Sequence, residues 1–137
     1  MSTPLEELGR AVKQLQHRHH RRLDSRLLEI GSSLAQWDAL RAIHRIPGVS
    51  SHALAEYTFQ TDQSFGAMAA ALLEKGLATR APGKGRALTY SLTPSGKDIL
   101  RKGTSFAEKV LSESFAPLGE AERKQLHGLL LQTLGGP

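Results

Sequence analysis

Residues 50–92 read SSHALAEYTFQTDQSFGAMAAALLEKGLATRAPGKGRALTYSL, and this stretch decides the fold. Ser50 can cap a short helix and Thr61 a longer one, because a hydroxyl oxygen at the cap accepts from a free backbone amide. The turn between the two helices falls at Phe59–Gln60, and Gly76 ends the second helix. The expected inward positions are Ala53, Leu54, Tyr57, Phe65, Met68, Leu72 and Leu73. A short helix, a tight turn and a second helix form a helix-turn-helix.

A β-hairpin is predicted directly after Gly76, where the helical spacing of apolar residues stops. Two short runs, 77–81 and 87–92, are expected to be strands, since Thr89 and Tyr90 suit extended backbone. The loop 82–86 contains a proline and two glycines, which suit a hairpin turn. The helix-turn-helix is therefore expected to carry a hairpin, or wing.

A long helix is predicted near the start of the chain. Thr3 is its expected N-cap, Pro4 suits the first helical position, and Glu6 completes a capping box. Gly31 is the expected stop. The apolar stripe of this helix consists of Leu5, Leu8, Val12, Leu15, Leu23, Leu27 and Ile30, with His19 taking one step.

Three further helices complete the pattern. Ser33 with Gln36 repeats the capping-box spacing, and Pro47–Gly48 ends that helix. Thr93–Pro94 restarts a helix after the wing, which runs toward Pro117, and the last helix begins at Glu120. Their apolar stripes are Leu34, Trp37, Leu40 and Ile43, then Ile99, Leu100, Phe106, Val110 and Leu111, then Leu126, Leu129, Leu130 and Leu134.

The predicted fold class is mainly α with a small β-hairpin wing. A winged helix-turn-helix at 33–92 is flanked by helices at 1–32 and 93–137, whose apolar stripes a single small unit could not fully cover. This favours dimerisation through the two flanking segments, and an ordinary core within one chain is the alternative. The residues expected at the dimer interface are Leu5, Leu8, Val12, Leu15, Leu126, Leu130 and Leu134.

Composition narrows the function classes. The 137 residues carry a net charge of +5, which favours a polyanionic partner. The chain has no cysteine, which excludes disulfides and thiolate metal sites, and only 5% aromatic residues, which disfavours a stacking platform for single strands. No apolar run approaches the roughly 20 residues that span a bilayer, and no signal peptide is visible. We therefore expect a cytoplasmic protein without a membrane partner.

Several segments together resemble the MarR family of bacterial transcription regulators. They are LAQWDAL at 34–40, PGVS at 47–50, LAE at 54–56, LLEKGL at 72–77 with Arg80 following, LTPSG at 92–96, and LGEAE at 118–122 with Leu126 and Leu129. The resemblance implies a homodimer whose two winged units straddle double-stranded DNA, with the fourth helix in the major groove and the wing in the minor groove. It also implies a pocket for a small-molecule effector between the dimerisation helices and the winged unit.

Two departures from the family pattern fall on the expected DNA contacts. The wing motif Asp-x-Arg is replaced by Lys84-Gly85-Arg86, so the arginine is kept and the aspartate that helps to hold the wing is lost. The fourth helix has Ala67 near its middle, where the family usually has an arginine.

The distribution of charge indicates how DNA is held. From Lys75 to Lys97 there are five cations and no acid, which suits a phosphate backbone or a narrow minor groove, although a solvated basic face is the alternative. Between Arg45 and Lys75 there is no Lys or Arg, so the fourth helix reads bases through neutral groups. Asp62 is interpreted as a first-turn acid. The expected DNA-binding residues are Ser50, Ser51, His52, Thr61, Gln63, Ser64, Ala67, Arg80, Lys84 and Arg86, with Arg86 the foremost.

A basic run, 17–22, lies inside the first helix. His17, His19 and His20 do not offer the i, i+4 pair that suits zinc, and neighbouring arginines repel a cation, so no metal is expected. A solvated or DNA-flanking face, with His19 partly packed, is the preferred interpretation. No nucleophile elbow, phosphate-binding glycine loop or paired-carboxylate motif is present, so we expect neither an enzyme nor a cofactor.

The sequence therefore predicts a MarR-like repressor that binds a pseudo-palindromic operator as a homodimer and is relieved by a small-molecule ligand. The alternative is a winged-helix module for protein–protein contact without specific DNA binding, which the cation-free fourth helix motivates.

Overall fold

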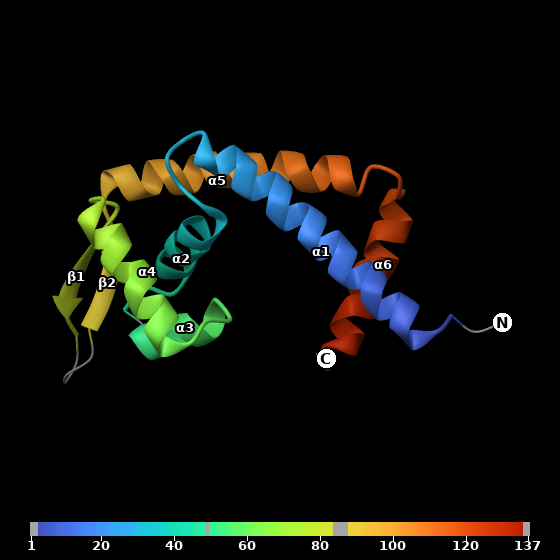
Figure 1. Ribbon diagram of the computed structural model, residues 1–137, viewed down its shortest axis with the longest axis horizontal. Helices are drawn as coiled ribbons and strands as arrows, with labels where there is room; N and C mark the ends of the chain where they lie inside the picture. Colours follow the sequence, from blue (N-terminus) through green and yellow to red (C-terminus); the bar gives the residue numbers. More distant parts are fainter. Residues whose placement is uncertain (1–2, 49, 84–87, 136–137) are drawn as a thin grey trace.

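The computed structural model describes residues 3–48, 50–83 and 88–135, which form six helices and a two-stranded sheet (Figure 1). The winged unit lies at one end of the molecule and α1 with α6 at the other, while α5 runs along the top and joins them (Figure 1). The elements are α1 (Leu5–Leu28), α2 (Leu34–Arg45), α3 (Ser51–Tyr57), α4 (Asp62–Glu74), β1 (Ala78–Pro82), β2 (Leu88–Leu92), α5 (Pro94–Ser114) and α6 (Glu120–Thr133). None of the described helices is both long and apolar enough to cross a membrane. The predicted fold class is confirmed.

The winged unit has its own core. Leu40 of α2, Leu54 of α3, and Phe65 and Leu72 of α4 are almost completely buried in it. The antiparallel pair β1–β2, in register from Ala78 opposite Leu92 to Pro82 opposite Leu88, covers this core. Tyr90 of β2 packs edge-on against Phe65, with ring centroids 6.2 Å apart. The core therefore fixes α4 against the hairpin and leaves the opposite face of α4 exposed.

Four predicted helix caps are confirmed, and each is a hydroxyl that accepts from a free amide in the first helical turn. The Oγ of Ser33 accepts from the Gln36 amide at 3.1 Å, and that of Ser50 from the Ala53 amide at 3.2 Å. The Thr61 and Thr93 hydroxyls accept from the Ser64 and Gly96 amides, both at 3.0 Å. These bonds satisfy amides that have no partner inside their helices, so the local sequence sets where α2, α3, α4 and α5 begin.

The prediction for the start of α1 is wrong. The helix begins at Leu5, and its cap is Pro4, whose extended backbone (φ −58°, ψ 136°) makes no side-chain capping bond. Thr3 therefore lies one residue too early to serve a capping box with Glu6. The helix ends at Leu28, so Ile30 lies beyond it, and Gly31 follows with a left-handed φ of 75°.

The predicted inward face of α3 is also partly wrong. Tyr57 is exposed, and its pKa is lowered by hydrogen bonds and charge from Arg45 and Arg41 on α2. Ala55 is buried in its place beside Leu54. In a helix of only seven residues, a large ring at the last position can reach the surface while a small residue takes the tight core position.

A second cluster joins the winged unit to the long helices. Leu23 and Leu27 of α1 pack with Trp37 of α2 and Leu100 of α5. The indole Nε1 of Trp37 donates to the Leu100 carbonyl at 3.2 Å. This junction sets the position of the winged unit relative to α1 and α5.

Candidate nucleic-acid interface

The exposed face of α4 carries the residues predicted to read bases. Phe65, Ala69 and Leu72 are buried, and the exposed side chains of the helix include Gln63, Ser64 and Ala67. Thr61 is also exposed, and its hydroxyl oxygen accepts the capping hydrogen bond from the Ser64 amide. The face offers an amide, a hydroxyl and a methyl group, which together can address base edges in a major groove.

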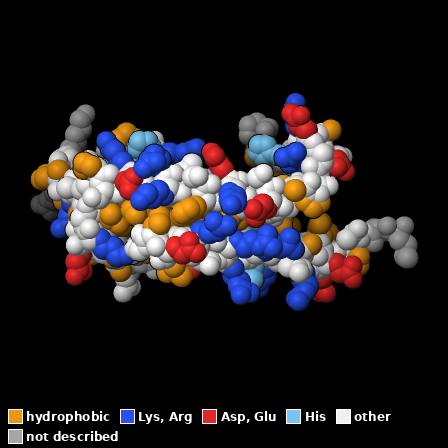
Figure 2. Space-filling model, turned by 90° about the horizontal axis from the view of Figure 1, so that it is seen from above, with side chains coloured by type: hydrophobic (Ala, Val, Ile, Leu, Met, Phe, Trp, Pro, Cys, Tyr) orange, Lys and Arg blue, Asp and Glu red, His pale blue; other side chains and the backbone are white. Residues whose placement is uncertain are grey.

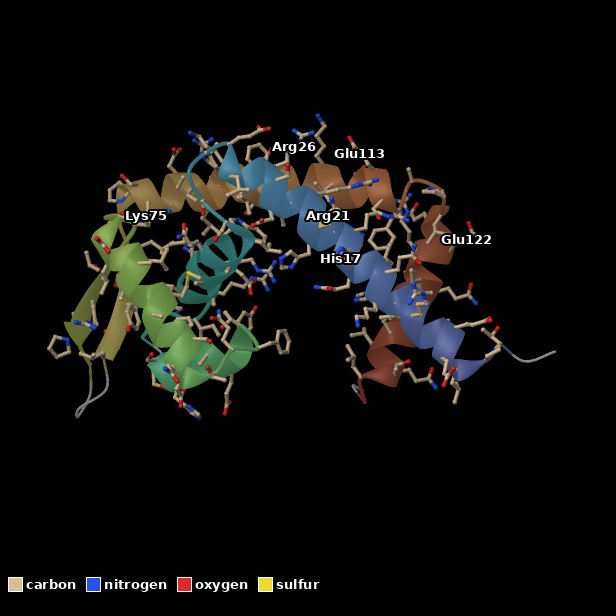
Figure 3. All side chains as sticks on the ribbon, in the orientation of Figure 1. His17, Arg21, Arg26, Lys75, Glu113 and Glu122 are labelled. Atoms are coloured by element: carbon tan, nitrogen blue, oxygen red, sulfur yellow. The ribbon has the colours of Figure 1, made fainter. Side chains whose placement is uncertain are left out.

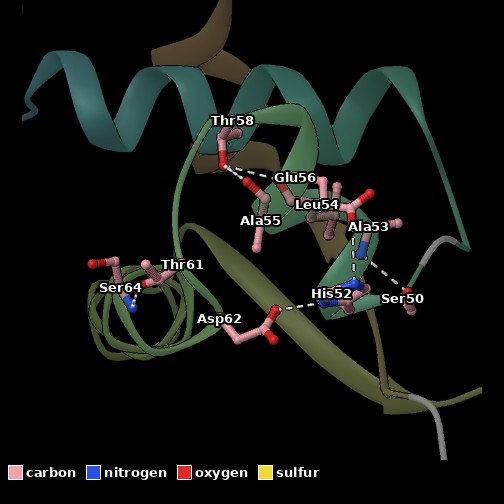
Figure 4. A network of polar contacts seen from close by, with 10 residues as sticks. All are labelled: Ser50, His52, Ala53, Leu54, Ala55, Glu56, Thr58, Thr61, Asp62 and Ser64. Atoms are coloured by element: carbon pink, nitrogen blue, oxygen red, sulfur yellow. Dashed lines mark hydrogen bonds and ion pairs between the residues drawn. The ribbon is translucent and has the colours of Figure 1, made fainter.

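A polar network ties the start of α3 to the start of α4 (Figure 4). The Nδ1 of His52 lies 2.8 Å from Oδ1 of Asp62, and its Nε2 lies 3.1 Å from Oε1 of Glu56. The hydrogen bond with Asp62, the charges of Asp62 and Glu56 and a weaker bond with Glu56 raise the pKa of His52. Asp62, expected to be no more than a first-turn acid, thus also holds a histidine. The spacing of His52 and Glu56 could have indicated their contact, but the ten-residue separation of His52 and Asp62 could not.

The remaining α3 residues lie beside this network. Ser50 and Ser51 are half-buried and His52 is exposed. The oxygen of Ser50 caps α3, and its O–H remains able to donate. Figure 4 shows the His52 side chain at the start of α3 and the Asp62 side chain at the start of α4 pointing toward each other.

The cations expected on the wing divide into three groups. Arg80, on β1, is exposed. Lys75 links α4 to the start of α2, since its Nζ donates to the Gly31 carbonyl and to Oε1 of Gln36, both at 3.0 Å. Lys84 and Arg86 lie outside the described residues. Of the three cations predicted to contact DNA from the wing, Arg80 is therefore the one that lies in the described part of the chain.

The residues predicted to form a dimer interface are mostly exposed in the single chain. Leu5 and Leu134 are 82% and 81% exposed, and Leu8 and Val12 are each about half exposed. Leu130 is also exposed, whereas Leu15 and Leu126 are half-buried. An intrachain core, the alternative explanation of these stripes, therefore leaves five of these seven side chains exposed.

A hollow of about 520 Å³ lies between α2 and α5. Trp37, Leu100 and Leu111 give it an apolar wall, and its cations include Lys97 and Arg101. The hollow is also lined by Arg41, whose guanidinium lies 5.3 Å over the Trp37 ring. The buried Nε of Arg41 has no hydrogen-bond partner among the described residues. An unpaired buried donor beside an aromatic face suits a planar anion.

The comparisons with known proteins agree with this arrangement. A family model described as MarR family matches residues 30–87. This segment, less than half of the chain, is similar to the MarR family. No curated protein sequence matched the chain.

Solved structures extend the MarR fold to nearly the whole chain. A mutant MarR from E. coli complexed with operator DNA has a TM-score of 0.85 at 22% identity, over 97% of this chain and 99% of its own. A probable transcriptional regulator from Pseudomonas aeruginosa has a TM-score of 0.81 at 25% identity, over 95% of this chain and 99% of its own. A MarR family protein of Mycobacterium tuberculosis in complex with p-aminosalicylic acid has a TM-score of 0.76 at 22% identity, over 98% of this chain and 100% of its own. The predicted family resemblance is confirmed, and the fold is that of MarR regulators.

The described residues contain no group of three or more metal-ligating side chains. His17 and His20 therefore have no third ligand in this part of the chain. The prediction that His19 is partly packed is confirmed, because it is half-buried and its Nε2 lies 2.7 Å from the Ser114 hydroxyl.

Proposed function

We propose that this protein is a cytoplasmic transcriptional repressor that binds a pseudo-palindromic operator as a homodimer. The observation that carries the proposal is the two-sided α4, whose apolar face is fixed in the core while Gln63, Ser64 and Ala67 face solvent. The MarR fold supports it, since structural neighbours include a MarR bound to operator DNA.

Base reading is assigned to the first turns of α4. Gln63 can pair with an adenine through two hydrogen bonds, Ser64 can bond a base or a phosphate, and the Ala67 methyl can meet a thymine methyl. Thr61, Ser50, Ser51 and His52 are assigned to the flanking phosphates, where hydroxyls and amides at helix starts bind anions.

Affinity is assigned largely to the wing, because α4 carries no Lys or Arg. Arg80, Lys84 and Arg86 are the proposed contacts to the backbone or the minor groove. This division predicts that wing variants weaken binding to every duplex, whereas α4 variants change sequence preference.

Dimerisation is assigned to the two flanking segments, 1–32 and 93–137, with the winged unit at 33–92 between them. The exposed leucines of α1 and α6 support this, because a large apolar patch without cover marks an interface. A two-fold dimer would present two α4 helices to half-sites about one helical turn apart, roughly ten base pairs.

The hollow beside Arg41 is assigned to an anionic aromatic effector. Trp37, 5% exposed and covered by Arg41, forms part of the apolar wall, and the cations of the hollow outnumber its one carboxylate, Glu108, which suits an anionic ligand. The neighbours complexed with p-aminosalicylic acid and salicylic acid support this ligand class. Because the hollow lies between α2 and α5, an occupant can change the position of the winged unit.

The test is fluorescence anisotropy of labelled DNA from upstream of the protein's own gene, with random duplex alongside, over a salt series. We expect tight, sequence-preferring binding that weakens steeply with salt. Equal binding to both duplexes would indicate a binder of shape and charge. Negligible binding to both at low salt would favour the protein–protein module.

A further inference from the structure

The basic run of α1 lines a groove that the proposed function does not use. Residues of this run recur every three or four positions on one helix face, with Val110 and Glu113 of α5 as the other wall. Figure 3 labels His17, Arg21 and Arg26 along α1 and Glu113 on the neighbouring α5. The groove has a volume of about 620 Å³, which lies in the range of small-molecule sites.

The charge in the groove is not neutralised by the fold. Arg18, Arg21, Arg22 and Arg26 face one carboxylate, Glu113, which leaves three positive charges in excess. Among the described residues, none of these four guanidiniums forms an ion pair. Patches of Lys and Arg side chains are visible on the surface seen in Figure 2.

The charge of this run also affects the pKa of the neighbouring His19. His19 lies between Arg18 and Arg22 in the run. Its pKa is lowered first by burial and then by the charges of Arg18 and Arg22.

The groove is held in shape by the buried apolar stripe of α1, which lies next to the arginine face. His19 contacts the Ser114 hydroxyl at 2.7 Å and packs edge-on against Phe115, with ring centroids 5.3 Å apart. Leu23 and Leu27 are buried against α2 and α5. These contacts fix the rotation of α1, so the arginine face is directed into the groove before any ligand arrives. A site arranged in advance loses less entropy when it binds.

We propose that this groove binds a small organic anion with two or more negative charges, such as a phosphorylated or polycarboxylate compound. Guanidiniums at three- and four-residue spacing can each make paired bonds to separate anionic groups. Glu113 can accept from a hydroxyl or amine on the same ligand, whereas it would repel a phosphate backbone. Val110, 5% exposed, gives the ligand an apolar contact. The groove is separate from the hollow at Arg41, which α2 and α5 form.

The experiment is isothermal titration calorimetry of the full-length protein with inorganic pyrophosphate and, separately, with citrate. The double variant Arg21→Gln with Arg22→Gln removes two exposed guanidiniums and is expected to weaken binding by about tenfold or more. The control Lys102→Gln also removes an exposed cation, but from α5 outside the groove, and is expected to leave affinity unchanged.

Glu113→Gln gives the proposal a second, opposite prediction. Removing the single carboxylate of the groove is expected to raise the affinity for both probes severalfold, which a general loss of folding could not do. Circular dichroism checks that each variant keeps its helical content.

Three outcomes would overturn the proposal. The first is no heat of binding for either probe, and the second is binding that all variants share, which would place the anions elsewhere. The third is a double variant that keeps its probe affinity but loses DNA affinity with a shallower salt dependence. That result would make this face a contact to DNA and not a site for a small anion.

Discussion

His52 connects the first turn of α3 to the first residue of α4 through a 2.8 Å contact between its Nδ1 and Oδ1 of Asp62. Its other nitrogen faces Glu56 at 3.1 Å. A neutral imidazole donates from one nitrogen only, so both carboxylates are satisfied together only by the imidazolium form. The charge on His52 therefore decides how negative the start of α4 is.

DNA affinity is expected to fall as the pH rises through the pKa of His52. Because Asp62 and Glu56 raise this pKa above its ordinary value of about 6.5, the charged form persists at that pH and the loss occurs above it. Loss of the proton leaves two carboxylates next to the DNA phosphates. Anisotropy titrations between about pH 6 and pH 9 measure the effect, and it should be severalfold.

Two variants isolate the histidine. His52→Gln should bind with little pH dependence over the same range, and Asp62→Asn should move the midpoint of the profile to lower pH. An unchanged profile in His52→Gln would assign the titration to another group.

Gly103→Ala is expected to destabilise the fold. A Cβ at Gly103 would overlap the indole of Trp37, which is held by its bond to the Leu100 carbonyl. The expected cost is about 1–3 kcal/mol in the free energy of unfolding, as for overpacked cores. Gly66→Ala is the matched control, because its helical position has open space and should gain up to about 1 kcal/mol. Urea unfolding at one protein concentration measures both, and equal effects would disprove the packing argument.

Leu8→Glu combined with Val12→Glu is expected to convert a dimer into a monomer. Both side chains are about half exposed in the single chain, so burying the rest of each at an interface contributes about 0.8–1.5 kcal/mol. A symmetric dimer has four such side chains, about 3–6 kcal/mol in total, so the double variant is expected to weaken the dimer Kd by at least about a hundredfold. Analytical ultracentrifugation measures the mass. Gln14→Glu, on the opposite side of α1, should remain dimeric, and a double variant that does so as well would place the interface elsewhere.

Salicylate is expected to weaken operator binding through the hollow at Arg41. Arg41→Met keeps the packing over Trp37 but removes the cation, so the variant should bind DNA and respond at least about tenfold less to the ligand. Lys102→Met removes a cation outside the hollow and should respond like the natural protein. Anisotropy at fixed DNA with increasing salicylate measures the response. An equal response in both variants would refute a role for Arg41.

Gln63→Ala and Arg80→Ala are expected to change different properties of DNA binding, the first its sequence preference and the second its overall affinity. The first should cost about 1–3 kcal/mol at the base pair that Gln63 contacts and relax the preference there. The second should weaken binding to every duplex and reduce the slope of log K against log salt by about 1. Competition with single-base operator variants and a salt series separate the two. A uniform loss in Gln63→Ala would show that α4 contacts only the backbone.

Much of the fold could be predicted from the sequence, because its signals are local. The hydroxyls of Ser33, Ser50, Thr61 and Thr93 begin their helices as expected, since each cap bond spans three residues. The prediction failed at Thr3, where Pro4 fixes an extended backbone and α1 starts without a side-chain cap. A pattern shows that a helix begins, but not which residue makes the bond.

The candidate site was less predictable, because its contacts join distant positions. The exposed face of α4 follows from helical spacing, so Gln63 and Ser64 were found. Asp62 and His52 come together only because the turn at Phe59 folds α4 back on α3, with Phe59 itself at a φ of 59°. Arg41 gave no signal in the sequence, since the burial of its Nε, which finds no partner in the described part of the chain, depends on how the helices pack.

The stacking of Arg41 on Trp37 has an optical consequence. Trp37 is the single tryptophan of the chain, so its emission comes from one place, the junction of α1, α2 and α5. Any occupant of the neighbouring hollow changes the polarity around that ring. The protein therefore carries its own spectroscopic reporter where the winged unit joins the long helices, and no label is needed to follow that junction in solution.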